Sequence, residues 1–330
     1  MGEKGFVVMT IEILMIVGFC LAAYSIVGND VPQTLGTFIS SNAHRPWWML
    51  WLYTSSILTI VLLYGWWASG IGDASYGRLE TIPFPATGIT WLYIVPPVLL
   101  ILLTKYGIPV STTFLVLTIF SPSSLGAMLT KSMMGYAVAF VVAIIVYRFV
   151  IKGISVYFSK TRDHKPAHIW VGLQWVSTAF LWSQWLIQDL ANIFVYVPRQ
   201  VPFSFLVFAI LVFVILLGMI FYQRGGAIQK IIDTKTGVAD IRSATIIDFI
   251  YAIILLIFKE WSNIPMSTTW VFLGLLAGRE FAMSMHLAEV NKYRTSRNVS
   301  KDAMKLMFGL IMSIVLATTL PWFYHFISNL

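Results

Sequence analysis

The chain has 330 residues, of which 58% are hydrophobic and only 11% are charged, and its mean hydropathy is +0.81. Because a water-soluble domain usually carries about 25% charged residues, this composition excludes a soluble protein and indicates a polytopic membrane protein in a lipid bilayer. The net charge of +8 needs no nucleic acid as a partner, since basic residues gathered in loops meet anionic headgroups instead. The single cysteine, Cys20, excludes an intrachain disulfide and a thiol metal site.

Six apolar runs are long enough to cross a bilayer as helices, because a crossing needs about 20 residues. The first run lacks the basic region and small-residue cleavage site of a signal peptide, so we interpret it as a retained span. The six runs lie near 6–28, 46–69, 135–151, 169–187, 203–222 and 305–327.

Two further apolar stretches are interrupted at their centres and do not fit single spans. The first, at about 87–129, is broken by Gly107 and Pro109, and the second, at about 244–285, is broken by Pro265. We predict that each forms a re-entrant helical hairpin. A pair of full crossings in either stretch is the alternative.

The interrupted stretches carry the same phrase, which shows that the chain is a tandem repeat. IPVSTT at 108–113 recurs as IPMSTT at 264–269, an offset of 265 − 109 = 156 residues. NDVPQ at 29–33 is matched by QDLAN at 188–192, an offset of 189 − 30 = 159 residues. Such self-similarity predicts two copies of one structural unit.

We therefore predict a first repeat over 1–156, a cytoplasmic linker over 157–168 and a second repeat over 169–330. Each repeat is expected to hold three transmembrane helices and one re-entrant hairpin. Because such a hairpin enters and leaves on one side, each repeat crosses the membrane an odd number of times. The predicted fold is thus an all-α polytopic membrane protein built from two inverted-topology repeats.

This topology divides the basic residues very unequally between the two sides of the membrane. Sixteen Lys and Arg residues fall on one side and four on the other. The positive-inside rule makes the rich side cytoplasmic, which predicts a multi-pass protein of the plasma (inner) membrane with both termini outside. Lys105 and Lys259 lie near the hairpin tips, and their role stays open. The four basic residues on the outer side are Lys4, Arg78, Lys131 and Arg199.

Asp30 and Asp189 occupy matched positions at the ends of apolar runs in the two halves. An ionisable residue at membrane depth is costly and normally faces a polar cavity, and broken helices are tolerated where they line one. Each aspartate taken alone is better explained as a helix cap at the interface. Their repetition favours two mid-membrane sites in discontinuous helices.

The STT phrases follow a proline where an apolar helix restarts. Such a position supplies hydroxyl donors and free backbone N–H groups at the positive end of a helix, which is suited to an anion. Two of these ends on opposed hairpin tips would surround a tetrahedral oxyanion. The alternative is that the hydroxyls only satisfy backbone groups or let helices pack closely. The candidates are Ser111, Thr112, Thr113, Ser267, Thr268 and Thr269.

The aspartate phrase and the STT phrase, once per half, resemble those of the inorganic phosphate transporter (PiT) family of cation-coupled symporters. The resemblance covers nearly the whole chain, including QRGGAIQKIIDTKTGVADIRSATIIDFIYAIILLIFKEWSNIPMSTT at 223–269. It implies that the STT hydroxyls bind phosphate, that sodium binds at Asp30 and Asp189, and that the protein is a homodimer. The residues implied to bind or couple cations are Asn29, Asp30, Gln33, Gln188, Asp189 and Asn192.

The chain also departs from the family pattern. The family phrase GANDVAN reads VGNDVPQ at 27–33 and LIQDLAN at 186–192, so each half keeps one asparagine and has glutamine at the other position. The histidine that usually follows STT is Phe114 in the first half and Trp270 in the second. These changes concern the substrate and the ion more than the fold.

We therefore expect a secondary active transporter that imports inorganic phosphate by symport with sodium ions. An anion entering a negative interior needs co-entering cations, and carboxylate and amide oxygens suit Na⁺. Proton coupling, sulfate as the substrate, and a passive anion channel are the alternatives, because a mid-membrane carboxylate can itself carry a proton. No nucleotide-binding or hydrolase motif occurs, so we expect neither an enzyme nor a cofactor.

Overall fold

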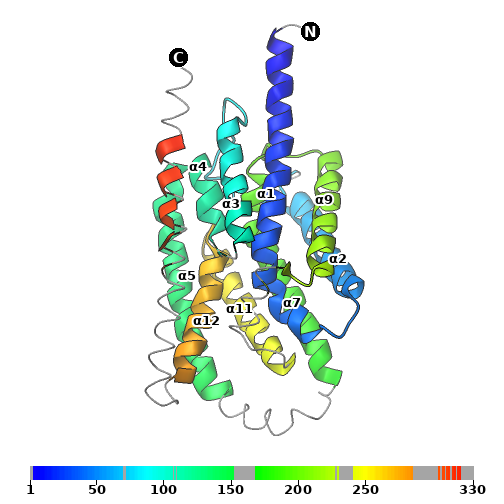
Figure 1. The fold of residues 1–330 in the computed structure, drawn as a ribbon, viewed down its shortest axis with the longest axis vertical. Coiled ribbons are helices and arrows are strands. Elements are labelled where there is room, and N and C mark those ends of the chain that lie inside the picture. The colour runs from blue at the N-terminus through cyan, green and yellow to red at the C-terminus, as the bar shows by residue number, and fades with distance from the viewer. Residues whose placement is uncertain are drawn as a thin grey trace.

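A computed structural model shows the chain as a bundle of helices (Figure 1). No strand occurs in the part of the chain that the structure describes, which confirms the all-α prediction there. The described residues are 3–151 without 70, 71, 107 and 109, then 168–226 with 229, then 241–284, and scattered positions between 304 and 320.

The first half consists of three long helices and a hairpin of short helical pieces. We call the pieces from η1 to α4 the first hairpin, and the turn between α3 and η2 the first tip. The elements are α1 (Glu3–Ser41), α2 (Trp47–Ala68), η1 (Trp91–Ile94), α3 (Val95–Lys105), η2 (Thr113–Leu117), α4 (Thr118–Phe120), η3 (Pro122–Ser124), α5 (Leu125–Val146) and η4 (Tyr147–Ile151).

The described part of the second half contains a broken helix, one very apolar helix and a hairpin of two longer helices. We call α11 and α12 the second hairpin, and the turn between them the second tip. The elements are α7 (His168–Asp189), α8 (Ala191–Phe194), α9 (Phe203–Tyr222), α11 (Ile241–Trp261) and α12 (Thr268–Ser284).

Four helical segments among the described residues are long and apolar enough to cross a membrane, judged by length and composition. The span predicted at 135–151 begins earlier than we expected, because the preceding residues already continue the helix. The span predicted at 305–327 and the linker at 157–168 lie largely outside the described residues. The four segments are Glu12–Ser41, Trp47–Ala68, Pro122–Phe149 and Phe203–Tyr222.

The arms of the two hairpins differ in length. In the first hairpin, α3 has 11 residues and η2 has 5, followed directly by the 3 residues of α4. Even with η1, which runs directly into α3 (Trp91–Lys105), each arm at about 1.5 Å per residue is shorter than the roughly 30 Å hydrocarbon core, which favours re-entrance. In the second hairpin, α11 has 21 residues and α12 has 17. The inverted topology and the repeat boundaries stay predictions.

The predicted break at Asp30 is wrong, because α1 is one continuous helix with Pro32 inside it. Proline removes a single backbone N–H, and polar side chains bond to the carbonyls nearby. The Gln33 Nε2 donates to the Asn29 carbonyl at 2.9 Å, and the Thr34 hydroxyl to the Asp30 carbonyl at 3.0 Å. The helix therefore bends in its second half without breaking (Figure 1). In the second half of the chain α7 does end at the aspartate.

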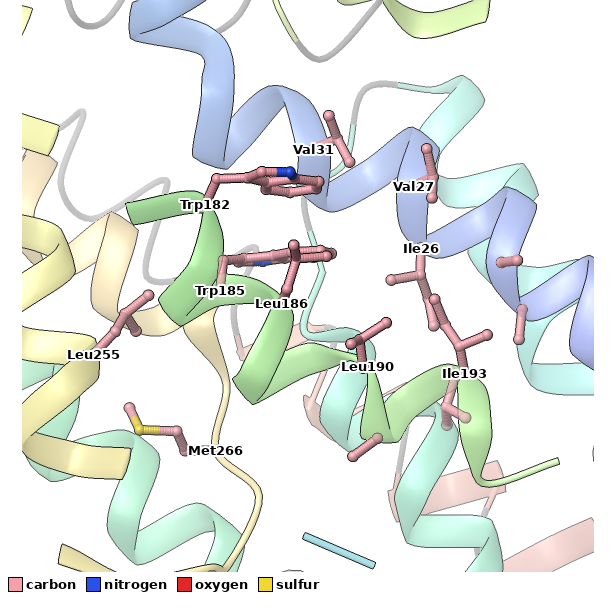
Figure 2. Packing of buried hydrophobic residues seen from close by; sticks show 14 of the residues in the cluster. Ile26, Val27, Val31, Trp182, Trp185, Leu186, Leu190, Ile193, Leu255 and Met266 are labelled. Carbon is pink, nitrogen blue, oxygen red and sulfur yellow. The ribbon is translucent and has the colours of Figure 1, made fainter. Parts of the chain in front are cut away.

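Helix packing brings the aspartate-bearing segments together at the centre of the molecule. α1 contacts both α7 and α8, α7 packs along α11, and α5 packs along α12. Trp182 and Trp185 of α7 stack with ring centroids 4.9 Å apart. Figure 2 shows both indoles pointing from α7 toward the part of α1 that carries Val27 and Val31. This apolar layer fixes the two aspartate segments relative to each other.

Candidate functional site

Asp30 and Asp189 are both buried, with side chains 1% and 0% exposed. Asp30 lies within α1, and Asp189 lies at the end of α7. Hydrogen bonds through Thr112 and Asn192 connect the two carboxylates. The structure thus brings the two matched aspartates into one site, as the repeat suggested.

The Asp30 carboxylate is bound by its own helix and by the first tip. Its Oδ1 accepts a hydrogen bond from Asn29 Nδ2 at 2.6 Å, and its Oδ2 accepts one from the Thr112 hydroxyl at 2.8 Å. Asn29 Nδ2 also lies 3.0 Å from the Val110 carbonyl oxygen. These bonds attach the first tip to α1 at the position of the aspartate.

The Asp189 carboxylate is linked to the same tip through Asn192. Asn192 Nδ2 donates to Asp189 Oδ1 at 2.8 Å and lies 3.2 Å and 3.3 Å from the hydroxyl oxygens of Thr112 and Thr113. Thr112 therefore donates to Asp30 and accepts from Asn192. One hydroxyl connects the aspartate of the first half to the amide of the second.

Four buried oxygens around the aspartates have no hydrogen-bond partner among the described residues. Each is an acceptor, and a buried acceptor without a donor is costly. Carboxylate and amide oxygens are also the ligands that hard cations prefer. The site therefore presents the kind of ligand atoms that a hard cation requires. The four atoms are Gln33 Oε1, Gln188 Oε1, Asp189 Oδ2 and Asn192 Oδ1.

The two glutamines direct their amide nitrogens to backbone carbonyls. Gln33 Nε2 donates to the Asn29 carbonyl at 2.9 Å, and Gln188 Nε2 donates to the Leu255 carbonyl at 3.0 Å. The amide oxygens are left as the unpartnered groups. All six predicted cation-site residues are buried and lie in this region, on α1 or across the end of α7.

The two serines of the STT phrases cap the helices that follow them. Ser111 Oγ accepts the backbone N–H of Phe114, and Ser267 Oγ accepts that of Trp270, both at 3.3 Å. The backbone N–H of Ser267 donates to Ser132 Oγ of α5 at 2.9 Å. Both serines thus fulfil the capping alternative, while each keeps its own hydroxyl proton as a donor.

The threonines bring the two tips into contact. The Thr113 hydroxyl donates to the Met266 carbonyl at 3.1 Å, and the Thr269 hydroxyl donates to the Val110 carbonyl at 3.4 Å. Thr268 lies beside Asp189, and its carbonyl accepts a hydrogen bond from the Tyr251 hydroxyl at 3.0 Å. The six predicted anion-site residues are buried around one centre.

The residues that replace the family's histidines form an apolar pair. The rings of Phe114 and Trp270 meet edge to face, with centroids 5.4 Å apart. Phe114 is fully buried and Trp270 is 7% exposed. This pair closes the space behind the two serine caps with an apolar contact that carries no titratable group.

Asp248 is a third buried carboxylate at the centre of the bundle, and the sequence analysis missed it. Its Oδ1 accepts the Thr37 hydroxyl at 2.5 Å and its Oδ2 accepts the Thr178 hydroxyl at 2.9 Å, which joins α11 to α1 and α7. The repeat could not reveal it, because an offset of 156 residues places Leu92 at the matching position. An acid within an apolar run was the available signal.

The two hairpin lysines differ in their surroundings. Lys259 is paired with Glu260 at 2.8 Å on the surface. Lys105 is exposed at the end of α3 and lines a cavity of about 270 Å³ between α1, α3 and α9. The Thr104 hydroxyl lines the same cavity and lies 3.4 Å from Asn29 Oδ1, so the cavity is one side chain away from the aspartate site.

Among the described residues, no three His, Cys, Asp or Glu side chains gather as they would around a transition metal. Comparison with known proteins gave no matching family model and no matching curated sequence. A solved structure described as a sodium-dependent phosphate transporter is similar, with a TM-score of 0.60 and 16% sequence identity. The match covers 96% of this chain and 99% of that one. At this identity the likeness shows a shared fold, which extends over nearly the entire chain.

Proposed function

We propose that the protein is a secondary active transporter that imports inorganic phosphate by symport with sodium ions. One observation carries the proposal. Two buried aspartates, one from each half, lie among side-chain oxygens that have no hydrogen-bond partner among the described residues, and the hydroxyl-bearing starts of two helices lie beside them. The fold likeness to a sodium-dependent phosphate transporter supports it. The carboxylate and amide oxygens suit a cation, and the neighbouring hydroxyl and N–H donors suit an anion that moves with it.

In this proposal the acceptor groups bind sodium. Asp189 Oδ2 and Asn192 Oδ1 are unpartnered on one side of the site, and Gln33 Oε1 is unpartnered on the other. A Na⁺ ion ligated there replaces the missing hydrogen bonds and offsets the negative charge of the aspartates. Each co-entering positive charge gains roughly 2.3 kcal/mol per 100 mV of membrane potential, which drives an anion into a negative interior.

The donor groups bind phosphate. The helical run through η2 and α4 begins at the first STT phrase and α12 begins at the second, so the first backbone N–H groups of each are available as donors. Ser111 and Ser267 each keep a hydroxyl proton to donate. A tetrahedral oxyanion bound between the tips meets donors from both halves of the chain.

Thr112 couples the two ligands in this scheme. Its hydroxyl donates to Asp30 in the structure, at 2.8 Å. When sodium takes over the Asp30 oxygen, the hydroxyl is released and can donate to phosphate instead. Each ligand therefore strengthens the binding of the other by the same factor, as linkage requires.

We further propose that the two halves are inverted repeats with both termini outside, and that the protein is a homodimer in the plasma membrane. Access to the central site alternates as one part of the fold moves against the other. We assign the cavity lined by Lys105 and Thr104 as the cytoplasmic exit, because Thr104 also contacts Asn29 beside Asp30. Solvent labelling of cysteines placed at Thr112 and Thr268 tests this, since phosphate should protect both from either side.

Uptake by purified protein in liposomes tests the proposed function. We expect radiolabelled phosphate to accumulate against its gradient when sodium is outside, and the accumulation to collapse when choline replaces sodium. Sulfate and arsenate, measured at two pH values, define the selectivity and any proton coupling. Flux that follows the phosphate gradient alone, regardless of sodium, would show a passive channel and contradict the proposal.

A further inference from the structure

Arg78 is held inside the protein by a tightly bonded loop after α2. The Asp73 carboxylate accepts the Ser75 backbone N–H and the Gly77 backbone N–H, both at 2.7 Å. Tyr76 and Gly77 adopt left-handed backbone conformations, with φ of 59° and 71°, immediately before Arg78. The loop thus turns the Arg78 side chain away from water, and it is only 1% exposed.

The buried guanidinium of Arg78 lacks partners for part of its donor set. Nε and Nη1 are buried and have no hydrogen-bond partner among the described residues. A buried guanidinium with unmade hydrogen bonds is costly. Burial lowers the pKa of Arg78 to about 10, against attraction from Asp189 and Glu260, so the group still carries its charge at neutral pH.

Lys131 of α5 is a second buried basic residue in the same region. It is 5% exposed, and its Nζ donates to the carbonyl oxygens of Ser262 and Ile264 in the second tip, at 2.7 and 2.8 Å. One of its three N–H donors is therefore left over. Gly77, the neighbour of Arg78, faces Asn263, which lies between the two tip residues that Lys131 contacts.

The acidic groups near this pair are engaged elsewhere. Glu260 forms its ion pair with Lys259 on the surface, and Asp189 belongs to the central site. No described residue forms an ion pair with Arg78 or Lys131. The loop packs on the second tip, since a Cβ placed on Gly77 would lie 3.5 Å from Asn263 Nδ2. Two buried basic side chains, neither in an ion pair with a described residue, thus lie where this loop meets the second tip.

We propose that Arg78 and Lys131 form a second oxyanion site, a binding station that phosphate occupies on its way from the outer face to the central site. This inference rests on the proposed function. A divalent oxyanion placed between the two side chains accepts the unused N–H donors and neutralises their charge. The loop must lift from the second tip to admit it, after which the anion lies beside the Asp189 region.

The matched control is Arg199, another arginine that contacts this loop. Its guanidinium donates to the carbonyl oxygens of Ile82, Val195 and Val197, at 2.7 to 3.3 Å. These bonds use four of the five guanidinium N–H groups, which gives Arg199 a structural role. Arg199→Gln should therefore lower stability without changing the phosphate concentration needed for half-maximal uptake.

Phosphate uptake kinetics at saturating external sodium test the proposal. The variants are Arg78→Gln, Arg78→Lys and Lys131→Met. We expect Arg78→Gln to raise the KM for external phosphate at least about tenfold while the sodium requirement stays unchanged, because one charge-assisted contact is lost. Lys131→Met should shift the KM in the same direction, and Arg78→Lys should restore part of the loss.

An unchanged phosphate KM in both Arg78→Gln and Lys131→Met would overturn the proposal. A change in the sodium requirement that exceeds the change in phosphate KM would also overturn it, because Arg78 would then serve only as the counter-ion of Asp189. If Arg78→Gln does not fold, Lys131→Met and Arg78→Lys decide the outcome. Phosphate should also raise the melting temperature of the purified wild type more than that of Lys131→Met. The melting temperature reports phosphate binding, so it tests the second site even if no uptake is measured. Failure of the proposed transport function would instead show as absent phosphate uptake by the wild type.

Discussion

The two hairpin tips carry the same STT phrase, yet different parts of the molecule hold them. The first tip is bound by the cation-site residues: Asn29 reaches the Val110 carbonyl, and Thr112 lies between Asp30 and Asn192. The second tip is bound mainly from α5, where Lys131 and Ser132 meet its backbone at 2.7 to 2.9 Å. In the proposed symport, cation binding therefore acts directly on the first tip.

The aspartate segments differ in a complementary way. The first half has asparagine before its aspartate and glutamine after it, and the second half has the reverse order. In both halves, however, an asparagine amide donates to the aspartate Oδ1, at 2.6 Å from Asn29 and 2.8 Å from Asn192. Both glutamines are left with an unpartnered oxygen. The repeat thus conserves an arrangement of atoms while the residue order changes.

The largest effect should follow from removing the charge of either aspartate. We expect Asp189→Asn to raise the sodium concentration for half-maximal uptake by about a hundredfold or to abolish uptake, because a charged ligand with a free oxygen is lost. Asp30→Asn should have a similar but smaller effect, since both Asp30 oxygens already accept hydrogen bonds. Sodium titrations of phosphate uptake measure this.

Glu12→Gln is the control for these variants, because Glu12 is an exposed acid on the same helix as Asp30. It should leave the sodium requirement unchanged. If both aspartate variants transport normally with the wild-type sodium dependence, the cation site is assigned to the wrong residues.

The next effect concerns the hydroxyl that joins the two halves. Thr112→Val keeps the shape of the side chain but removes a donor to Asp30 and an acceptor for Asn192. We expect the phosphate KM to rise roughly tenfold to hundredfold. Thr269→Val should cost less, because the Thr269 hydroxyl makes one long bond of 3.4 Å.

Thr118→Val provides a control on the same hairpin arm, since the buried Thr118 hydroxyl has no partner among the described residues. It should leave transport unchanged and not lower stability. Equal KM values for Thr112→Val and Thr118→Val would contradict the bridging role of Thr112.

The smallest effect is expected at the serine caps. Ser111→Ala and Ser267→Ala each remove a cap at 3.3 Å, which should lower the free energy of unfolding by about 0.5–2 kcal/mol. The two losses should be similar, because the caps are alike. Thermal unfolding in detergent checks this, and a loss of phosphate binding with unchanged stability would show that the serines serve the anion alone.

Sequence alone was sufficient to predict which polar residues the structure buries together, but not how they are connected. An apolar medium makes buried carboxylates and hydroxyls rare, so their recurrence in both halves pointed to Asp30, Asp189 and the STT phrases. The continuity of α1 could not be foreseen, because it depends on side-chain bonds from Gln33 and Thr34 that compensate for a proline.

Residues without a counterpart in the other half of the chain were harder to find from the sequence. Asp248 has Leu92 at its matching position, so the repeat gave no signal for it. Arg78 and Lys131 counted as outer-side charges in the topology, whereas the structure buries both. Their burial results from the loop after α2 folding onto the second tip, and such a long-range contact leaves no local pattern in the sequence.

Coupled binding measurements test the central claim most directly, namely that cation and anion meet at Thr112. Phosphate affinity of the purified protein is measured over a range of sodium concentrations, and sodium affinity over a range of phosphate concentrations, for the wild type and Thr112→Val. We predict that each ligand tightens the other by the same factor in the wild type, and that this factor falls toward one in the variant. Phosphate affinity that is indifferent to sodium in the wild type would contradict the account.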